Sequence, residues 1–365
     1  MKGHTFKSTT SFLSAMILVA AGFIAAPASA ATPGAAPSEE TVSAPALPSF
    51  DITARQPSVK YTRAQLDRIG GDPRIVEYWT PERMANAIPL DGPRTSPALD
   101  AKAVATALQA VPEVAEKSVA EAATADSVAG IAPLASAVNK TSRKNGKVFF
   151  RDARDGKDYV CSGAAINSAS KRLVATAGHC VHGGKGGTWH RNWVFVPSYK
   201  NGSQPYGYFT AKAFRTYGDW ITYGATTARG LNSDVAFVTT YMSKKGKRVV
   251  KAVGGHGLSY GGSRIFSANI FGYPTNLSRG ETQKACAGKT SSRAVGGYSF
   301  PSVSGCNFGG GSSGGPWLAS YNSKTGVGNL RSVTSFGPIN SNSFIAGPYF
   351  DKRITALYKA ANGDW

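Results

Sequence analysis

Short apolar runs separated by Gly, Asn and Ser fill the last 220 residues of the chain. The clearest runs are Val148–Phe150, Leu173–Thr176, Trp193–Val196, Val235–Val238 and Ile265–Phe271. Many short strands at fairly regular spacing predict an all-β barrel or sandwich. A final amphipathic stretch, Asp351–Ala361, predicts a terminal helix, because Ile354, Leu357 and Tyr358 recur on one helical face.

A different pattern opens the chain. Two lysines precede the 15-residue apolar run Phe12–Ala26, and Ala28–Ala30 then forms an A-x-A cleavage signature. A membrane anchor is the alternative, but this run is shorter than the roughly 20 residues that span a bilayer. We therefore expect a cleaved secretory signal over residues 1–30 and a secreted, extracellular protein without membrane association.

Residues 31–145 are rich in Ala, Pro and acidic side chains and contain no Cys. Two stretches predict helices: Ala64–Ile69, and Thr80–Ala87, where a capping Thr precedes Pro at the first helical position. Asp100–Ala122 suits either a helix or a loose linker. Val128–Ser142 is rich in small residues and predicts an exposed, cleavable joint.

The formal charge of +20 suggests at first a protein that binds nucleic acid or an anionic surface. Almost all of this charge lies in residues 146–365, which hold 27 basic and 8 acidic residues. Their one tight basic cluster, Lys244–Arg248, lacks the interleaved aromatic residues of a nucleic-acid site. It fits a solvated hairpin turn better, so we expect no dedicated nucleic-acid site.

Four cysteines in an exported chain predict two disulfides. They are Cys161, Cys180, Cys286 and Cys306. Of three possible pairings we favour the sequential one, in which each bridge closes a loop of roughly 20 residues and contributes about 3 kcal/mol in the chain-entropy model. A zinc site built from Cys180, His182 and His190 is the alternative, but no C-x-x-C pair accompanies it. We expect no metal and no other cofactor.

The stretch Gly309–Pro316 carries the clearest chemical signal, because glycines flank two serines there. Such glycines let the backbone turn sharply, expose a hydroxyl and aim N–H groups at one point, as an oxyanion hole requires. A flexible linker is one alternative, but the stretch continues into the apolar run Pro316–Leu318. A phosphate-binding loop is another, but the Lys of that motif is missing.

A serine nucleophile needs a base, and the chain has five histidines. His179 follows the apolar run Leu173–Thr176 and a glycine, which places its imidazole at a strand end. We expect His182, His190 and His256 to be satisfied structural side chains.

A buried carboxylate is needed to orient the imidazole. Asp234 opens the apolar run Val235–Val238, so its side chain can point at the buried end of a strand. Asp219, which precedes Trp220, is the runner-up.

Three motifs therefore occur in the order His, Asp, Ser: Thr176–Cys180, Asp234–Phe237 and Gly311–Pro316. Together they resemble the chymotrypsin-like (trypsin-like) serine proteases over about residues 146–365. More narrowly they resemble the secreted bacterial branch, similar to the glutamyl endopeptidases. The resemblance implies an all-β fold of two six-stranded antiparallel β-barrels, with the catalytic residues in the cleft between them.

The resemblance also implies roles for single residues. His179 would act as general base and acid, Asp234 would orient it, and Ser313 would be the nucleophile. The N–H groups of Gly311 and Ser313 would form the oxyanion hole, and a Cys161–Cys180 disulfide would flank the histidine. We expect a monomeric serine endopeptidase that acts on proteins or peptides through an acyl-enzyme. A catalytically silent module of this fold that binds proteins or anionic polymers is the alternative.

One departure from the family pattern concerns activation. Ser312 stands where many members have an Asp that pairs with the newly cut N-terminus, and a serine cannot form that ion pair. We expect instead that residues 31–145 form a propeptide and linker that assists folding or inhibits, and that the mature domain spans residues 146–365.

A second departure concerns specificity. The resemblance places the S1 pocket at Asn307, Phe308, Thr334, Ser335, Phe336 and Gly337, with Phe344–Tyr349 beyond. Asn307 replaces the Asp of trypsin-like enzymes, and Thr334 replaces the His of many glutamyl endopeptidases. Glu281 is the only Glu after residue 145, a scarcity that would protect a Glu-specific enzyme from itself. The sequence leaves the S1 preference open between Glu, Lys or Arg, and small or apolar side chains.

Overall fold

The computed structural model describes residues 41–45, 61–90, 94–95, 111–125, 141–338 and 341–364. They belong to one compact unit, Glu39–Trp365; the other unit, Met1–Ser38, lies outside the described residues. The expected secretory signal and most of the expected joint at 128–142 lie outside them too. Among the residues that are described, no helix combines the length and the apolar character needed to cross a membrane.

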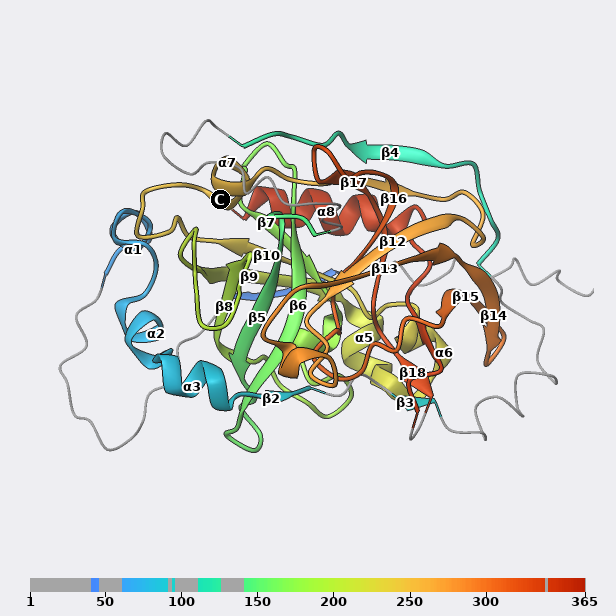
Figure 1. Ribbon diagram of the computed structural model, residues 1–365, viewed down its shortest axis with the longest axis horizontal. Coiled ribbons are helices and arrows are strands. Elements are labelled where there is room, and N and C mark those ends of the chain that lie inside the picture. Colours follow the sequence, from blue (N-terminus) through green and yellow to red (C-terminus); the bar gives the residue numbers. More distant parts are fainter. Residues whose placement is uncertain are drawn as a thin grey trace, which may run out of the picture. The chain divides into compact units, whose positions relative to one another are not determined.

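Between Asn145 and Thr240, six antiparallel strands form a closed barrel (Figure 1). We call this region the first half and the residues after it the second half. The strands are β5 (Asn145–Arg151), β6 (Asp158–Ile166), β7 (Leu173–Thr176), β8 (Arg191–Pro197), β9 (Phe209–Tyr217) and β10 (Ala236–Thr240). They pair in the order β9-β10-β7-β6-β5-β8, and pairing of β8 with β9 closes the ring. Val148, Phe195 and Phe237 are fully buried in its core. Four of the five predicted apolar runs are thus confirmed as strands of this barrel.

Most strands of the second half lie in two sheets, and β18 (Gly337–Pro338) pairs separately with β3 (Arg94–Thr95) of the N-terminal region. The first has the order β13 (Lys284–Lys289), β12 (Ser267–Gly272), β16 (Pro316–Asn322), β17 (Val327–Val333), β11 (Gly257–Tyr260) and β4 (Lys117–Ala120). The second consists of β14 (Ser291–Val295), β15 (Tyr298–Ser304) and β19 (Phe344–Ala346). The fifth predicted run lies on β12, and the expected all-β class is confirmed. Among the described strands, the hydrogen-bonded ring closes in the first half alone.

Short helices connect these strands, and a longer one ends the chain. They are η1 (Gly178–Cys180), α5 (Gly218–Tyr223), η2 (Gly224–Thr226), α6 (Ala228–Leu231), α7 (Val249–Val253), η3 (Ser278–Gly280) and α8 (Arg353–Gly363). The predicted terminal helix is confirmed as α8. Its Ile354 and Leu357 are fully buried, and the hydroxyl of Tyr358 donates to the carbonyl of Asn167 (2.9 Å).

The region before residue 146 contributes elements of its own. They are β1 (Thr41–Pro45), α1 (Arg63–Ile69), α2 (Pro73–Tyr78), α3 (Pro81–Asn86), β2 (Ile88–Pro89), β3 (Arg94–Thr95) and β4. Both predicted helices are confirmed as α1 and α3, and the Thr80 hydroxyl caps α3 by accepting from the Arg83 N–H (3.3 Å). Asp72 followed by Pro73 is the same kind of signal, and it begins α2, which we did not predict.

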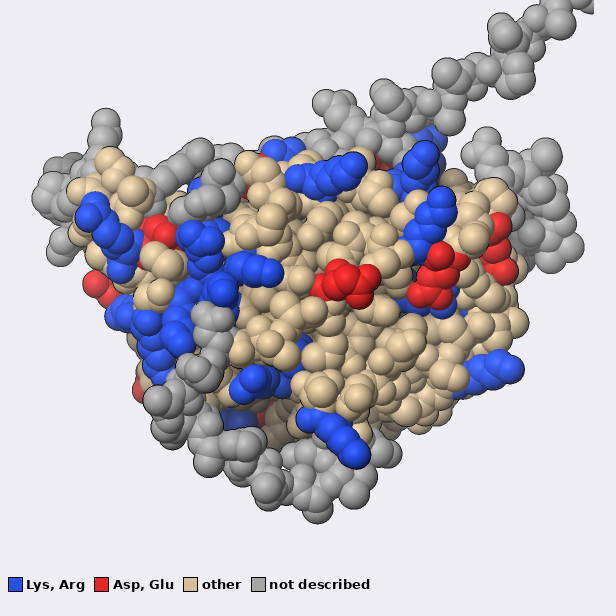
Figure 2. All heavy atoms as spheres, turned by 90° about the horizontal axis from the view of Figure 1, so that it is seen from above, with Lys and Arg blue, Asp and Glu red and all other residues tan. Residues whose placement is uncertain are grey.

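The stretch Asp100–Ala122 differs from both expectations in its described part. Residues 111–122 contain no helix, and they are not a loose linker either, because β4 pairs with β11 of the second half. Glu113 and Glu116 form ion pairs with Arg264 and Arg331 (3.5 and 3.2 Å). The acidic side chains of this stretch thus meet basic side chains of the second half. Lys and Arg of the described residues gather toward the left of the face in Figure 2.

Candidate active site

His179 lies on η1, shortly after β7, and is buried. Its backbone N–H donates to Asp234 Oδ1 (2.7 Å), and its ring Nδ1 lies 2.7 Å from Asp234 Oδ2. The two side chains are 6% and 0% exposed. A carboxylate can only accept, so Nδ1 carries the proton and Nε2 keeps a free lone pair. Within the described residues, Nε2 has no hydrogen-bond partner.

Asp234 lies between α6 and β10, where the chain enters the barrel. Besides the two groups of His179, its Oδ2 accepts a hydrogen bond from the Ser335 hydroxyl (2.5 Å). Three donors therefore fix the orientation of one fully buried carboxylate. We expected Ser335 only as a wall of the S1 pocket. The runner-up Asp219 lies elsewhere, because its carboxylate pairs with Arg229 (2.9 Å).

Ser313 belongs to the loop before β16, in the second half. Its carbonyl accepts from the N–H of Ser162 (2.7 Å), and the next N–H, of Gly314, donates to the Thr334 carbonyl (2.7 Å). Gly314 has φ 78°, and a Cβ there would lie 2.8 Å from the backbone nitrogen of Ala177. This close approach brings the serine loop against the segment that leads into His179. Among the described residues, however, no hydrogen bond joins the Ser313 side chain to Nε2 of His179.

Gly311 is the residue at which the loop turns, with φ 86°. A Cβ there would lie 2.7 Å from the Tyr273 carbonyl oxygen, so a side chain would not fit. Its N–H, the expected oxyanion donor, points at the carbonyl oxygen of Leu90 (3.4 Å). Ser312 is buried, and its hydroxyl donates to the Gly309 carbonyl (2.6 Å). The loop is therefore closed by a hydrogen bond within itself at the position where many relatives have an Asp.

The other histidines of the domain are buried and bonded, as expected. Nδ1 of His182 accepts from the Gly184 N–H (3.1 Å), and burial lowers its pKa to about 4. Nε2 of His190 lies 3.0 Å from the His179 carbonyl, and burial lowers the pKa of His190 to about 4. Nε2 of His256 lies 2.9 Å from Asn145 Oδ1, and burial lowers the pKa of His256 well below its usual value. His190 is thus a partner of His179 that sequence reasoning did not find.

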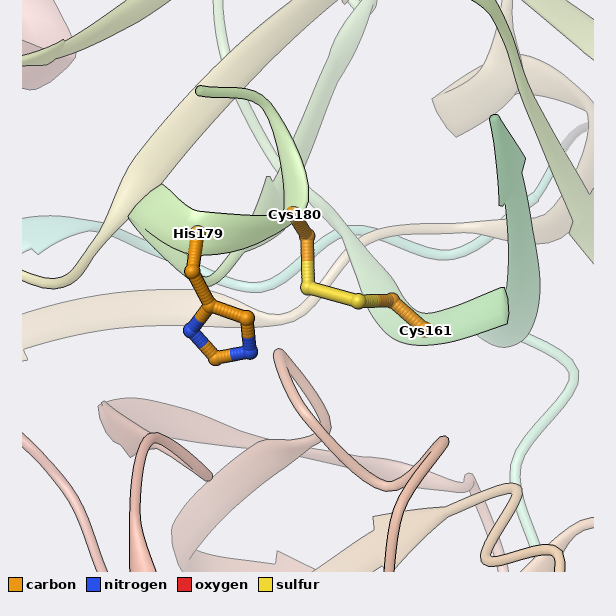
Figure 3. A group of neighbouring side chains, drawn as sticks. All are labelled: Cys161, His179 and Cys180. Atoms are coloured by element: carbon orange, nitrogen blue, oxygen red, sulfur yellow. A yellow bond between two sulfur atoms is a disulfide. The ribbon is translucent and has the colours of Figure 1, made fainter. Parts of the chain in front are cut away.

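Both predicted disulfides are confirmed. Cys161 on β6 bonds to Cys180 on η1, and Cys286 on β13 bonds to Cys306, with Cα–Cα distances of 6.3 and 5.6 Å. Cys161, Cys180 and His179 are the one group in the described part whose atoms lie close enough together to hold a metal (Figure 3). The two sulfur atoms are bonded to each other, so neither is a thiolate that could ligate zinc. The bridge instead ties η1 to β6.

A hollow of about 310 Å³, open to solvent, lies beside Ser313. Its lining residues are Phe308, Gly309, Gly310, Ser312, Ser313, Thr334, Ser335, Phe336, Gly337, Ser341, Asn342, Phe344 and Ile345. Five of the six expected pocket residues line it, and Asn307 does not; Ser341 and Asn342 are additions. The Thr334 hydroxyl oxygen accepts from the Trp317 indole (3.0 Å). No charged side chain belongs to this lining within the described residues.

Solved structures of two bacterial-type proteases are similar to this chain. One is protease Anisep from Arthrobacter nicotinovorans, with 34% identity and a TM-score of 0.54 over 61% of this chain and 97% of that one. The other is the thermostable serine protease AL20 from an extremophilic microorganism, with 31% identity and a TM-score of 0.54 over 60% and 97%. A Glu endopeptidase in complex with MPD is 17% identical, with a TM-score of 0.49. No protein-family model and no curated protein matches the chain.

Proposed function

This chain belongs to the bacterial chymotrypsin-like serine proteases, and we propose that it is a secreted serine endopeptidase made as a preproenzyme. The observation that carries the proposal is the buried Asp234 carboxylate, which accepts from both His179 N–H groups. This arrangement leaves Nε2 of His179 as a base beside the Ser313 loop. The two disulfides support an extracellular location, because such bonds persist in oxidising compartments.

In the proposed reaction, the Ser313 hydroxyl attacks the scissile carbonyl while Nε2 of His179 takes its proton. Asp234 stabilises the imidazolium that forms, and the N–H groups of Gly311 and Ser313 bind the developing oxyanion. His179 then donates the proton to the leaving amine, and an acyl-enzyme remains on Ser313. Water, activated by the same imidazole, hydrolyses that ester and restores the serine.

We propose proteins or peptides with an uncharged P1 side chain as substrates. Aromatic rings of Phe308, Phe336 and Phe344 line the hollow beside Ser313, and its lining contains neither an acid for Lys or Arg nor a histidine for Glu. An ion inside such a lining would lose its hydration without gaining a partner. An uncharged side chain avoids that cost.

Labelling with a fluorophosphonate probe tests the activity directly, since the probe reacts only with an activated serine. We expect the processed, secreted protein to be labelled and Ser313→Ala to give no label with an unchanged thermal midpoint. Asp219→Asn is the matched control for the Asp234→Asn variant, because Asp219 pairs with Arg229 outside the site. A catalytically silent module would give no label in any variant.

A further inference from the structure

The segment after α3 lies at the mouth of the candidate site. β2 pairs in parallel with β6, placing Ile88 opposite Tyr159 and Pro89 opposite Val160. The next residue, Leu90, continues the ladder, because its N–H donates to the Val160 carbonyl (3.1 Å). The Leu90 carbonyl accepts from the N–H of Gly311 (3.4 Å). One of the two N–H groups proposed for the oxyanion is therefore already engaged by the N-terminal region.

A second contact lies on the other side of the hollow. β3 (Arg94–Thr95) pairs in parallel with β18 (Gly337–Pro338), next to the pocket wall formed by Ser335 and Phe336. Figure 1 shows β3 beside β18 and β2 at the end of β6. The same short stretch of chain thus touches both the leaving-group side and the pocket side of the cleft.

The direction of this stretch is opposite to that of a substrate. The resemblance to the chymotrypsin-like proteases implies that a substrate whose P1 side chain fills the hollow has its residues N-terminal to the scissile bond along the β18 wall. Its residues C-terminal to that bond extend toward β6. In this chain the earlier residues, Ile88–Leu90, lie at β6, and the later ones, Arg94–Thr95, lie at β18. A reversed strand exchanges the places of N–H and C=O groups, so the described peptide groups of this stretch meet the site in an arrangement that a substrate does not have.

Helices α1 to α3 hold this stretch in place. The Asp67 carboxylate on α1 binds Arg172 through two hydrogen bonds (2.6 and 2.9 Å), and the Arg172 side chain is fully buried. Trp79, 4% exposed, donates its indole N–H to the Asn192 carbonyl of β8. Trp79 also packs in a buried cluster with Phe149 and other side chains of the barrel. Trp79 lies only nine positions before Ile88, so the docked helices restrain the segment in the cleft.

We propose that residues 61–90 and 94–95 form a tethered inhibitor that docks on the first barrel and contacts both sides of the substrate cleft in the direction opposite to that of a substrate. The proposal rests on the proposed peptidase function and specifies how that site is regulated. The inhibitor blocks the oxyanion N–H of Gly311 and the β18 wall, and the enzyme does not cut it there because its peptide bonds are reversed. Activation therefore requires release of the docked helices.

The first experiment compares fluorophosphonate labelling of the uncut full-length chain, separated by size, with that of the processed enzyme. The labelling rate of the uncut chain scales with the fraction of molecules whose cleft is open. We therefore expect the uncut chain to be labelled at least about tenfold more slowly than the processed enzyme. Trp79→Ala and Asp67→Asn remove two independent anchors, and each should speed labelling of the uncut chain at least about tenfold. Glu77→Gln, at an exposed position of α2, is the matched control and should change nothing.

The outcomes separate the two proposals. If the processed enzyme is not labelled, the proposed peptidase function is wrong, and so is the proposed inhibitor that rests on it. If it is labelled and the uncut chain reacts equally fast, the inhibitor alone is wrong. Near-ultraviolet circular dichroism of each variant checks folding. A folded Trp79→Ala chain that labels no faster than the wild type also contradicts the proposal.

The second experiment tests direction. Processed enzyme is added to the full-length Ser313→Ala chain, which cannot cut itself, and the fragments are identified by mass. We expect the first cuts to lie outside Ile88–Leu90 and Arg94–Thr95. A first cut within either stretch would mean that it binds in the direction of a substrate, and the reversed arrangement would be refuted.

Discussion

In the first half, His179 and Asp234 are buried on segments that join the strands of a closed barrel, and hydrogen bonds to the Asp234 carboxylate fix them. In the second half, Ser313 lies on a loop of an open sheet, and backbone conformation positions it. Gly311 and Gly314 both adopt positive φ there, and Gly314 touches the backbone of Ala177. The position of the proposed base thus depends on side-chain hydrogen bonds, and that of the proposed nucleophile depends on glycines, which lack a side chain.

The largest effect should come from the first half. Asp234→Asn replaces a carboxylate that only accepts by an amide that also donates, so the imidazole would turn its unprotonated nitrogen toward the amide. Nε2 would then carry the proton and could not act as a base. We expect kcat to fall about 10⁴-fold, the scale known for this change in a serine-protease triad. Steady-state cleavage of a peptide substrate measures it.

Asp219→Asn provides the comparison for that variant. The same amide exchange at a carboxylate that pairs with Arg229 should leave kcat within a factor of a few, because this pair is partly exposed and modest in energy. Equal losses in both variants would mean that charge in general, and not the tautomer of His179, controls the activity.

The next effect tests the backbone of the second half. Gly314→Ala introduces a Cβ that would lie against the hydroxyl of Thr176 and the backbone of Ala177, so the serine loop must move. A displacement of about 1 Å at a reacting group can cost about 100-fold in rate. We expect probe labelling per folded molecule to fall by at least that factor, together with a lower thermal midpoint.

Gly305→Ala is the matched control in the same half. Gly305 has φ 82°, as Gly314 has φ 78°, but a Cβ there meets no atom within 4 Å. The Gly305→Ala variant should therefore lose about 1–2 kcal/mol of stability, because alanine is disfavoured in a left-handed backbone conformation. It should keep its labelling rate. If both alanine variants behave alike, the contact with Ala177 has no role of its own.

The difference between local patterns and contacts of distant residues explains what the sequence could predict. The strands around Val148 and Phe195, the capped helices and the three site residues all follow from local patterns of a few neighbouring residues. His179, Asp234 and Ser313 were also found by resemblance, because each lies within a short motif. Contacts between distant residues left no such pattern.

Leu90 is the clearest example of what stayed hidden. Its carbonyl meets the N–H of Gly311, which lies far away in the chain, and backbone groups carry no sequence signal for that pairing. The same holds for β4, where an Ala- and Glu-rich stretch with helical propensity becomes a strand because β11 offers a free edge. Tertiary contacts override local preference in both cases.

A smaller effect concerns stability in acid, and it arises in the first barrel. Burial lowers the pKa of His190 to about 4, whereas the unfolded side chain titrates near 6.5. Below about pH 6.5 the unfolded chain therefore binds a proton that the folded one does not, and stability falls as the pH drops toward 4. The full loss from this residue is roughly 3 kcal/mol.

His190→Gln tests this pH dependence, because its amide can still donate to the His179 carbonyl but does not titrate. We expect its thermal midpoint to fall less between pH 6.5 and 4 than that of the wild type. An unchanged slope would assign the acid sensitivity to other groups, such as His182 or His256, whose pKa values are also lowered by burial.

The smallest effect should again belong to the second half, where specificity resides. Asn342→Asp adds an acid to the lining of the hollow beside Ser313, so a Lys or Arg P1 side chain would gain a partner there. We expect kcat/KM for such substrates to rise about tenfold, a typical gain for one pocket contact. Asn201→Asp, at an exposed turn of the first half, adds the same charge away from the hollow and should change no preference. If both variants favour basic substrates equally, net charge and not the pocket selects them. The proposed division between a first half for proton transfer and a second half for recognition would then be wrong.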